Sequence, residues 1–273
     1  MKMNLNKKTY TKQASILFAL ILLLGVSGCS EPSETDSMEE NLSSVEEIRL
    51  YELAERKMEA ASSFKIETSG EVDPNIPLVA KQSLLAHKIK SGESYYNYTA
   101  SKGTASTFFE MYGTNGSGTL KTGTKLSKDL LPESVDEVKE ITINHFINIY
   151  GSKPYELHYI INEDSVLAIS DSTSNEDGHQ FTLTLHNELA TSAYKKHIVA
   201  TNTLQSEAPN FTSIKLVVEI DTNGYFKAIT YHEAYSIRIK LPVFGYSTQS
   251  IKAEIVDTFS SYNEPLEITP FKI

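Results

Sequence analysis

Apolar residues recur at spacings of three and four residues in three parts of the chain, which predicts three amphipathic helices. The first helix is expected to begin at Ser44, since Glu47 follows three residues later in the pattern of a capping box. It is expected to end near Ser62 and Ser63. Its apolar stripe consists of Val45, Ile48, Tyr51, Ala54, Met58 and Ala61.

The other two helices are predicted from the same periodicity. The second begins at another capping pattern, Ser134 and Glu137, just after Pro132. Its stripe consists of Val135, Val138, Ile141, His145, Phe146 and Ile149. The third begins near Asn187 and has a narrower stripe. That stripe consists of Leu189, Ala190, Ala193, Tyr194, His197 and Ile198.

Much of the remaining chain alternates between apolar and polar residues, as strands with one buried face do. The alternation is clear in residues 215–220 and 225–231, and Asn223-Gly224 between them predicts a hairpin turn. A second, Gly-rich hairpin is expected around residues 115–118. Further strands are expected at residues 64–72, 93–100, 104–112, 155–161, 181–185, 235–241 and 250–255.

The order of these elements predicts the fold class. Strands that follow one another through short turns form antiparallel sheets, and amphipathic helices cover one face of such a sheet. No linker interrupts the chain after residue 44, so residues 44–273 are predicted to form a single domain of the α+β class.

Residues 1–28 have the layout of a secretory signal peptide. Four lysines precede an uncharged apolar run from Ala14 to Gly25, which is shorter than the roughly 20 residues of a membrane-spanning helix. The segment Val26-Ser27-Gly28-Cys29 then looks like a lipobox, the signal of bacterial lipoproteins. This resemblance implies cleavage between Gly28 and Cys29 and attachment of a diacylglycerol to the cysteine sulfur. Acyl chains on Cys29 would anchor the protein at the outer face of the cell membrane.

The mature chain would have 245 residues and no second cysteine, which excludes an internal disulfide. Loss of the four signal-peptide lysines changes the net charge from −10 to −14, which argues against binding to nucleic acid. Residues 29–43 are rich in Ser, Glu, Asp and Pro after the cysteine, and are expected to form a flexible acidic tether. The tether and the lysine-rich signal favour a Gram-positive cell surface.

The chain also resembles a known group of proteins. The residues that carry the resemblance are "AERKMEAASSFKIETSGEV" at 54–72 and the closing segment at 257–270. They look like the LolA/LppX-like group of bacterial lipoproteins and lipoprotein carriers. Residues 188–231 are similar to extracellular lipoproteins of uncharacterised function. The resemblance is one of layout and loose apolar motifs, so no ligand-contacting residue can be transferred.

The resemblance implies a more specific architecture than the residue pattern does. It implies a strongly curved antiparallel sheet, in the form of a half-open β-barrel. About three helices would pack on the concave face or across its mouth and enclose an apolar cavity. Members of the group with known roles carry acyl chains or lipids there.

No pattern for catalysis or for a cofactor emerges. Residues 118–125 differ from a phosphate-binding loop because Thr124 separates the second glycine from Lys125. Asp221–Gly224 differs from a calcium loop, since its glycine comes at the fourth position. The seven histidines lack the spacing of a helical metal site, and no Gly-x-Ser-x-Gly nucleophile is present. His145 and His197 are interpreted as core or boundary residues of their helices. No enzyme activity, metal or cofactor is therefore expected.

The expected function is binding of an apolar or amphipathic, lipid-like ligand by a membrane-anchored lipoprotein. The alternative is a scaffold or sensor lipoprotein that binds a cell-envelope protein through its outer face and has a filled interior. The strands carry many tyrosines, which could line a cavity or simply pack as good strand formers. These are Tyr95, Tyr96, Tyr98, Tyr112, Tyr225, Tyr231, Tyr235 and Tyr246.

Overall fold

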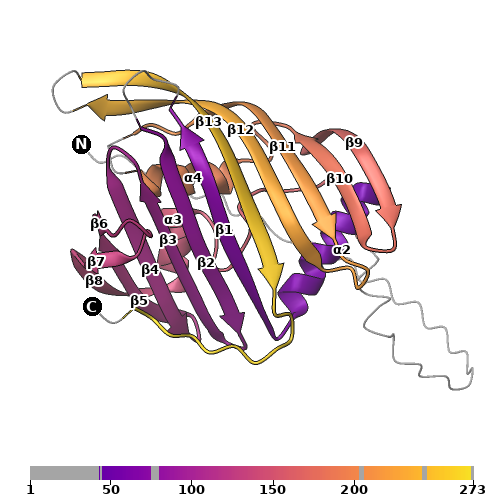
Figure 1. The fold of residues 1–273 in the computed structure, drawn as a ribbon, viewed down its shortest axis with the longest axis horizontal. Coiled ribbons are helices and arrows are strands. Elements are labelled where there is room, and N and C mark those ends of the chain that lie inside the picture. The colour runs from indigo at the N-terminus through magenta and orange to yellow at the C-terminus, as the bar shows by residue number, and fades with distance from the viewer. Residues whose placement is uncertain (1–42, 44, 75–79, 203–205, 242–244, 272–273) are drawn as a thin grey trace, which may run out of the picture. The chain divides into compact units, whose positions relative to one another are not determined.

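The computed structural model describes residues 43, 45–74, 80–202, 206–241 and 245–271 (Figure 1). The expected signal peptide, the lipobox with Gly28 and Cys29, and the tether up to residue 42 lie outside the described residues. Ser44, the expected first cap, lies outside them as well.

Eleven strands form one antiparallel sheet in the order β8-β5-β4-β3-β2-β1-β13-β12-β11-β10-β9. The first strand of the domain, β1, pairs with the last, β13, so it joins the two halves of the sheet (Figure 1). Within the described residues the edge strands β8 and β9 do not pair with each other, and the sheet is open. The strands are β1 (Ser63–Asp73), β2 (Gln82–Ser91), β3 (Ser94–Lys102), β4 (Ser106–Thr114), β5 (Ser117–Gly123), β8 (Glu137–Thr142), β9 (Val166–Asn175), β10 (Gly178–Leu185), β11 (Asn210–Ile220), β12 (Phe226–Leu241) and β13 (Gly245–Ser260). A separate two-stranded sheet contains β6 (Lys125–Leu126) and β7 (Pro132–Ser134).

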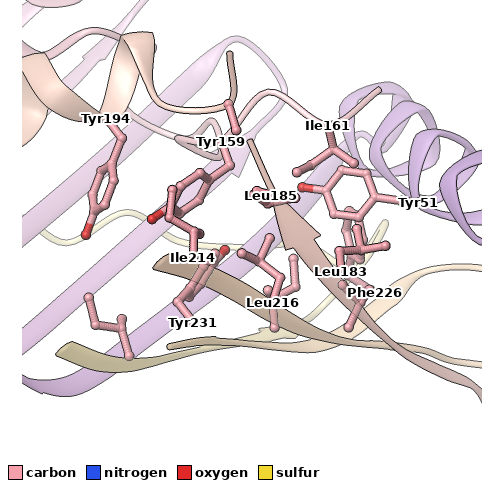
Figure 2. Packing of buried hydrophobic residues seen from close by; sticks show 14 of the residues in the cluster. Tyr51, Tyr159, Ile161, Leu183, Leu185, Tyr194, Ile214, Leu216, Phe226 and Tyr231 are labelled. Carbon is pink, nitrogen blue, oxygen red and sulfur yellow. The ribbon is translucent and has the colours of Figure 1, made fainter. Parts of the chain in front are cut away.

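The helices among the described residues are α2 (Glu46–Ala60), α3 (Ile143–Tyr150) and α4 (Ser192–Thr201), and they pack on the same face of the large sheet. Tyr51 and Met58 of α2 join a core that contains Ile66 of β1. Cross-strand pairs place Ile66 in one row with Met111 of β4, which packs under Phe146 of α3. Figure 1 shows α3 and α4 behind the strands, and Figure 2 shows Tyr51 of α2 pointing into the core.

The opposite face of the large sheet carries a smaller core over β3 and β4. Its buried residues are Tyr96, Tyr98, Ala100, Phe108 and Leu126. The C-terminal segment crosses this core, where Phe271 packs against Tyr98 with ring centroids 4.9 Å apart. The segment is tied down by Glu110, which accepts a hydrogen bond from the backbone N–H of Phe271 at 2.7 Å.

The predicted α+β class is confirmed, with an antiparallel sheet and three helices in the described part of the chain. The hairpin at residues 215–231 is confirmed too, with Gly224 at φ +75° in the turn between β11 and β12. Residues 118–125, which were compared with a phosphate-binding loop, lie mostly in the strand β5. The hairpin around residues 115–118 connects this strand to β4.

The second helix was predicted too early in the chain. Residues 132–134 and 137–142 form β7 and β8, and α3 begins only at Ile143, where the Thr142 hydroxyl caps the N–H of His145. Val138 is 60% exposed because β8 is an edge strand paired with β5 on one side only. The apolar spacing of residues 135–141 therefore belongs to the connection after β7 and to the strand β8.

The other helix starts also differ from the prediction. In the first helix the Ser43 hydroxyl accepts the N–H of Val45, and the helix begins at Glu46. The third helix begins at Ser192, since residues 187–190 form a turn that leaves Leu189 half exposed.

Some strand predictions were wrong. Residues 155–161 form an irregular loop that packs against the helix-covered face, where Tyr159 and Ile161 are buried without strand pairing and Ile160 is 43% exposed. β2 and β9 were not predicted, and the two strands expected at 225–241 form one long strand, β12.

Candidate functional site

A cavity of about 730 Å³ lies on the helix-covered face of the sheet. Its walls come from β1 to β5, β12 and β13, from α3 and α4, and from the loop that contains His158 and Tyr159. Its aliphatic lining includes Val72, Leu84, Ala86, Ile198, Ile237, Ile239, Ile251 and Ile255. A concave, largely apolar space of 300–1,000 Å³ with a few polar groups is typical of a site for a small ligand.

The alternation of side chains along β12 and β13 determines which of their residues line the cavity. Along β12, every second side chain from Tyr231 to Ile239 lines the cavity, and Ile251, Ile255 and Asp257 of β13 do the same. Because side chains of a strand alternate between its two faces, the intervening His232 and Glu254 lie on the other face. The sequence of β12 and β13 therefore builds an apolar wall and inserts two acidic residues in it.

The first acidic residue, Glu233, is held by two tyrosines from outside the sheet. The Tyr159 hydroxyl donates to its Oε1 at 2.8 Å, and the Tyr194 hydroxyl of α4 donates to its Oε2 at 3.2 Å. Burial raises the pKa of Glu233 to about 7, although the two hydrogen bonds favour the carboxylate and oppose the rise. Its side chain therefore titrates near neutral pH.

The second acidic residue, Asp257, is held from within the sheet. The hydroxyls of Thr68 and Tyr231 donate to its two carboxylate oxygens, at 2.6 Å and 2.9 Å. Tyr231 also stacks on Tyr159, with ring centroids 5.6 Å apart, and the two rings lie side by side in Figure 2. All four carboxylate oxygens of Glu233 and Asp257 thus accept a hydroxyl hydrogen bond.

Lys88 of β2 places a cation on the same face of the sheet. Its Nζ donates to the carbonyl oxygen of Glu156 at 3.0 Å and lies 3.1 Å from Nε2 of His158. An ammonium group has only donors, so Nε2 of His158 accepts, and its Nδ1 donates to the Ser152 hydroxyl at 3.0 Å. Burial, followed by the charge of Lys88, holds the pKa of His158 well below its ordinary value, and the ring is neutral.

His197 of α4 completes this group. Its ring lies against that of His158, with centroids 4.3 Å apart, and it lines the cavity. Burial, with a smaller effect of Lys88, lowers its pKa to about 3. Its Nδ1 is buried and has no hydrogen-bond partner among the described residues. A buried polar atom without a partner is unusual in a protein interior.

The tyrosines predicted as a possible lining divide into two groups. Tyr231 and Tyr235 line the cavity, joined by three tyrosines from outside the predicted set, Tyr150, Tyr159 and Tyr194. The remaining strand tyrosines do not line it. Tyr95, Tyr96 and Tyr98 pack in the core, Tyr112 and Tyr225 are partly buried, and Tyr246 is 44% exposed.

The structure corrects one of the two histidine interpretations. His145 is exposed on α3, because the apolar stripe that included it began in a strand. His197 does lie at the core boundary, but next to His158, which sits in the loop wrongly predicted as a strand. The described part of the chain contains no group of three His, Cys, Asp or Glu side chains that could hold a metal ion.

The sequence analysis missed the polar groups of the cavity. A signal for two of them was present, because Glu233 and Asp257 interrupt the buried positions of otherwise apolar strands. Lys88 gave no such signal, since β2 itself was not predicted. His158 and Tyr159 lie in a loop, where no periodicity indicates which side chains turn inward.

Comparisons with known proteins were made for the whole chain. No known protein family matches it, and no curated protein matches it. Among solved structures it is similar to a LolA superfamily protein from Nitrosomonas europaea, with 10% sequence identity and a TM-score of 0.26. The match covers 81% of this chain and 93% of that one. A likeness at this level assigns neither a ligand nor an activity. Among the helices that the structure describes, none has the length and apolar character needed to cross a bilayer.

Proposed function

We propose that this protein is a lipid-anchored, extracytoplasmic lipoprotein that binds an apolar or amphipathic ligand, such as a lipid, in the cavity beneath α4. The observation that carries the proposal is the cavity itself, about 730 Å³ in volume and walled by aliphatic and tyrosine side chains. The alternative, a scaffold or sensor that binds a cell-envelope protein, calls for large side chains packed across this space. The cavity favours the binding protein.

Burial of aliphatic surface would supply the affinity. Each buried methylene contributes about 0.8 kcal/mol, so a ten-carbon chain would gain about 8 kcal/mol. Association and ordering of the chain would cost part of this gain. The lining can supply such contacts, since Ile237, Ile239 and Ile251 lie together at one end of the cavity wall.

Attachment to the membrane rests on the sequence of residues 1–29. The lysine-rich head, the apolar run and the lipobox occur in the order that processing and lipidation require. Anchoring through Cys29 would keep the domain at the outer face of the cell membrane, close to a source of lipid ligands. The acidic tether would hold the domain away from the bilayer surface.

The test compares lipid retention by two matched variants. Ala86→Phe places a ring in the cavity, because Ala86 is a buried lining residue of β2. Ala168→Phe makes the same change at an exposed position of β9 outside the lining. The full chain is purified in detergent from a bacterial host, and native mass spectrometry with lipid extraction measures the bound species.

We expect the wild type and Ala168→Phe to retain about one acyl-chain ligand per protein, and Ala86→Phe to retain much less. Equal retention by the two variants would mean that the lipid is only associated with the detergent micelle. That result, or a wild type without any ligand that also fails to take up a fluorescent fatty acid, would contradict the proposal and favour a protein partner.

A further inference from the structure

The lysine and the two acidic residues of the cavity lining lie towards one end, and the other end is lined by uncharged residues that include several isoleucines. Cross-strand pairing places Lys88 beside Ile66, and the next row contains Thr68 and Asp257. The following rows along β12 carry Tyr231 and Glu233. Beyond them β12 and β13 line the cavity with uncharged residues, Ile237, Ile239 and Ile251 together with Tyr235 and Gln249. From Asp257 to Ile251 the strand advances about 20 Å, so an elongated ligand would have its head and tail in different surroundings.

The polar end has unused capacity for an anion and little for a cation. Every carboxylate oxygen of Glu233 and Asp257 already accepts a hydroxyl hydrogen bond. Lys88 has three N–H donors, of which two have partners among the described residues. His197 adds a buried Nδ1 that has no partner within the described part of the chain.

The groups around Lys88 leave its charge only partly balanced. Burial lowers the pKa of Lys88, and the two charged side chains that act on it, Asp257 and Glu156, oppose this and favour its ammonium form. Neither forms a salt bridge with it within 4 Å, since Glu156 meets it through the backbone carbonyl and pairs with Lys153 instead. His158 and His197 beside it are neutral. A buried ammonium gains most from an anion in direct contact.

We propose that Lys88 and His197 form the head-group site of the cavity and select amphipathic ligands with a single anionic head, a carboxylate or a phosphate. The Lys88 ammonium and the Nδ1–H of His197 donate to the anion, and the acyl chain extends along β12 and β13 towards Ile237. This inference rests on the proposed function, because it assigns a head group to the ligand of the same cavity.

The test separates head-group selection from cavity binding. Purified full chain is titrated with palmitate, hexadecyl phosphate and hexadecanol, which share a sixteen-carbon chain and differ in the head. Lys88→Met removes the cation and keeps the length of the side chain. Lys90→Met is the matched control, because Lys90 lies on the same strand, bonds to the carbonyls of Glu59 and Ala61, and does not line the cavity.

We expect the wild type and Lys90→Met to bind palmitate or hexadecyl phosphate at least tenfold more tightly than hexadecanol, as a hydrogen bond to a charged group would provide. Lys88→Met should bring the ratio close to one and leave hexadecanol binding within a fewfold of the wild type. Whichever of palmitate and hexadecyl phosphate binds more tightly identifies the preferred head group as a carboxylate or a phosphate.

A second variant keeps the inference testable if Lys88→Met fails to fold. His197→Phe retains a ring against His158 and removes the nitrogen, so it should lower the preference for the anion several-fold. If hexadecanol binds as tightly as the anions to the wild type, or if neither variant changes the ratio, the head-group site is wrong while the lipid-binding function stands. If none of the three ligands binds, both proposals fail.

Discussion

Glu233 is a carboxylic acid at a position where β12 otherwise presents tyrosine and isoleucine to the cavity. Two tyrosine hydroxyls hold its oxygens, and burial still raises its pKa to about 7. The same cavity holds neutral histidines, because burial lowers the pKa values of His158 and His197. Burial thus raises the pKa of the acid and lowers the pKa values of the histidines within one cavity. A substitution of one residue can test its effect on stability by itself.

Replacement of Glu233 by glutamine should change how stability depends on pH. The folded pKa of Glu233 lies above its ordinary value of 4.5, so its stabilising effect is complete below pH 4.5 and is lost as the pH rises through 7. Relative to wild type, Glu233→Gln should therefore gain about 3 kcal/mol in free energy of unfolding between pH 4 and pH 8. Urea unfolding of both proteins at the two pH values measures this difference.

The histidines do not disturb this comparison. Their folded pKa values lie below the ordinary value of 6.5, so they destabilise the fold as the pH falls below 6.5. Both proteins contain them, and their contribution cancels in the difference. A difference between Glu233→Gln and wild type that is the same at pH 4 and pH 8 would show that Glu233 is not held with a raised pKa.

At the scale of elements, α3 and α4 are joined by one close approach. α3 ends at Gly151, which has φ +91° and donates its N–H to the carbonyl of Ile147 at 2.8 Å. A Cβ at this position would lie 2.2 Å from the backbone carbonyl oxygen of Ala193 in α4. Only glycine allows both the left-handed conformation and this contact. The position of α4 over the cavity therefore depends on Gly151, the residue that caps the C-terminus of α3.

Gly151→Ala should destabilise the fold more than an alanine at another left-handed glycine. Gly92 in the turn between β2 and β3 has φ +57° and open space where a Cβ would lie. We expect Gly92→Ala to cost about 1 kcal/mol from the backbone conformation alone. Gly151→Ala should cost more than about 2 kcal/mol, because backbone must also move. Equal losses in urea unfolding would contradict the close packing of the two helices.

At the scale of the whole molecule, the sheet and the proposed anchor have separate roles. The residues that line the cavity all belong to residues 68–257, whereas attachment to the membrane would depend on Cys29 alone. One substitution should therefore remove the anchor without changing the folded domain.

Cys29→Ala tests the anchor in a bacterial host. Only a thiol can form the thioether to diacylglycerol, so the variant should not incorporate labelled fatty acid and should keep the 28-residue signal. Wild type and the control Ser27→Ala, which keeps a small residue before the cleavage site, should incorporate the label and sediment with membranes. Lipid labelling of Cys29→Ala that equals the wild type would show that Cys29 is not the attachment site.

The sequence by itself determined the fold class and much of the strand pattern. Period-two alternation depends only on one buried and one exposed face, so residues 64–72, 181–185 and 215–220 were assigned correctly as strands. The Asn223-Gly224 turn was also readable, because its conformation is a local property of two residues. The first helix was found because its stripe is long, although its cap was misplaced by about one residue.

Tertiary structure decided what local pattern could not. Residues 135–141 have apolar spacing that fits a helix, but pairing with β5 makes residues 137–142 a strand, because ladder hydrogen bonds depend on a distant partner. The cavity was decided in the same way. Lys88, His158, His197 and Glu233 come from a strand, a loop, a helix and another strand, and only the folding of the sheet under α4 brings them together. No local spacing along the chain records a contact between residues as far apart as Lys88 and His158.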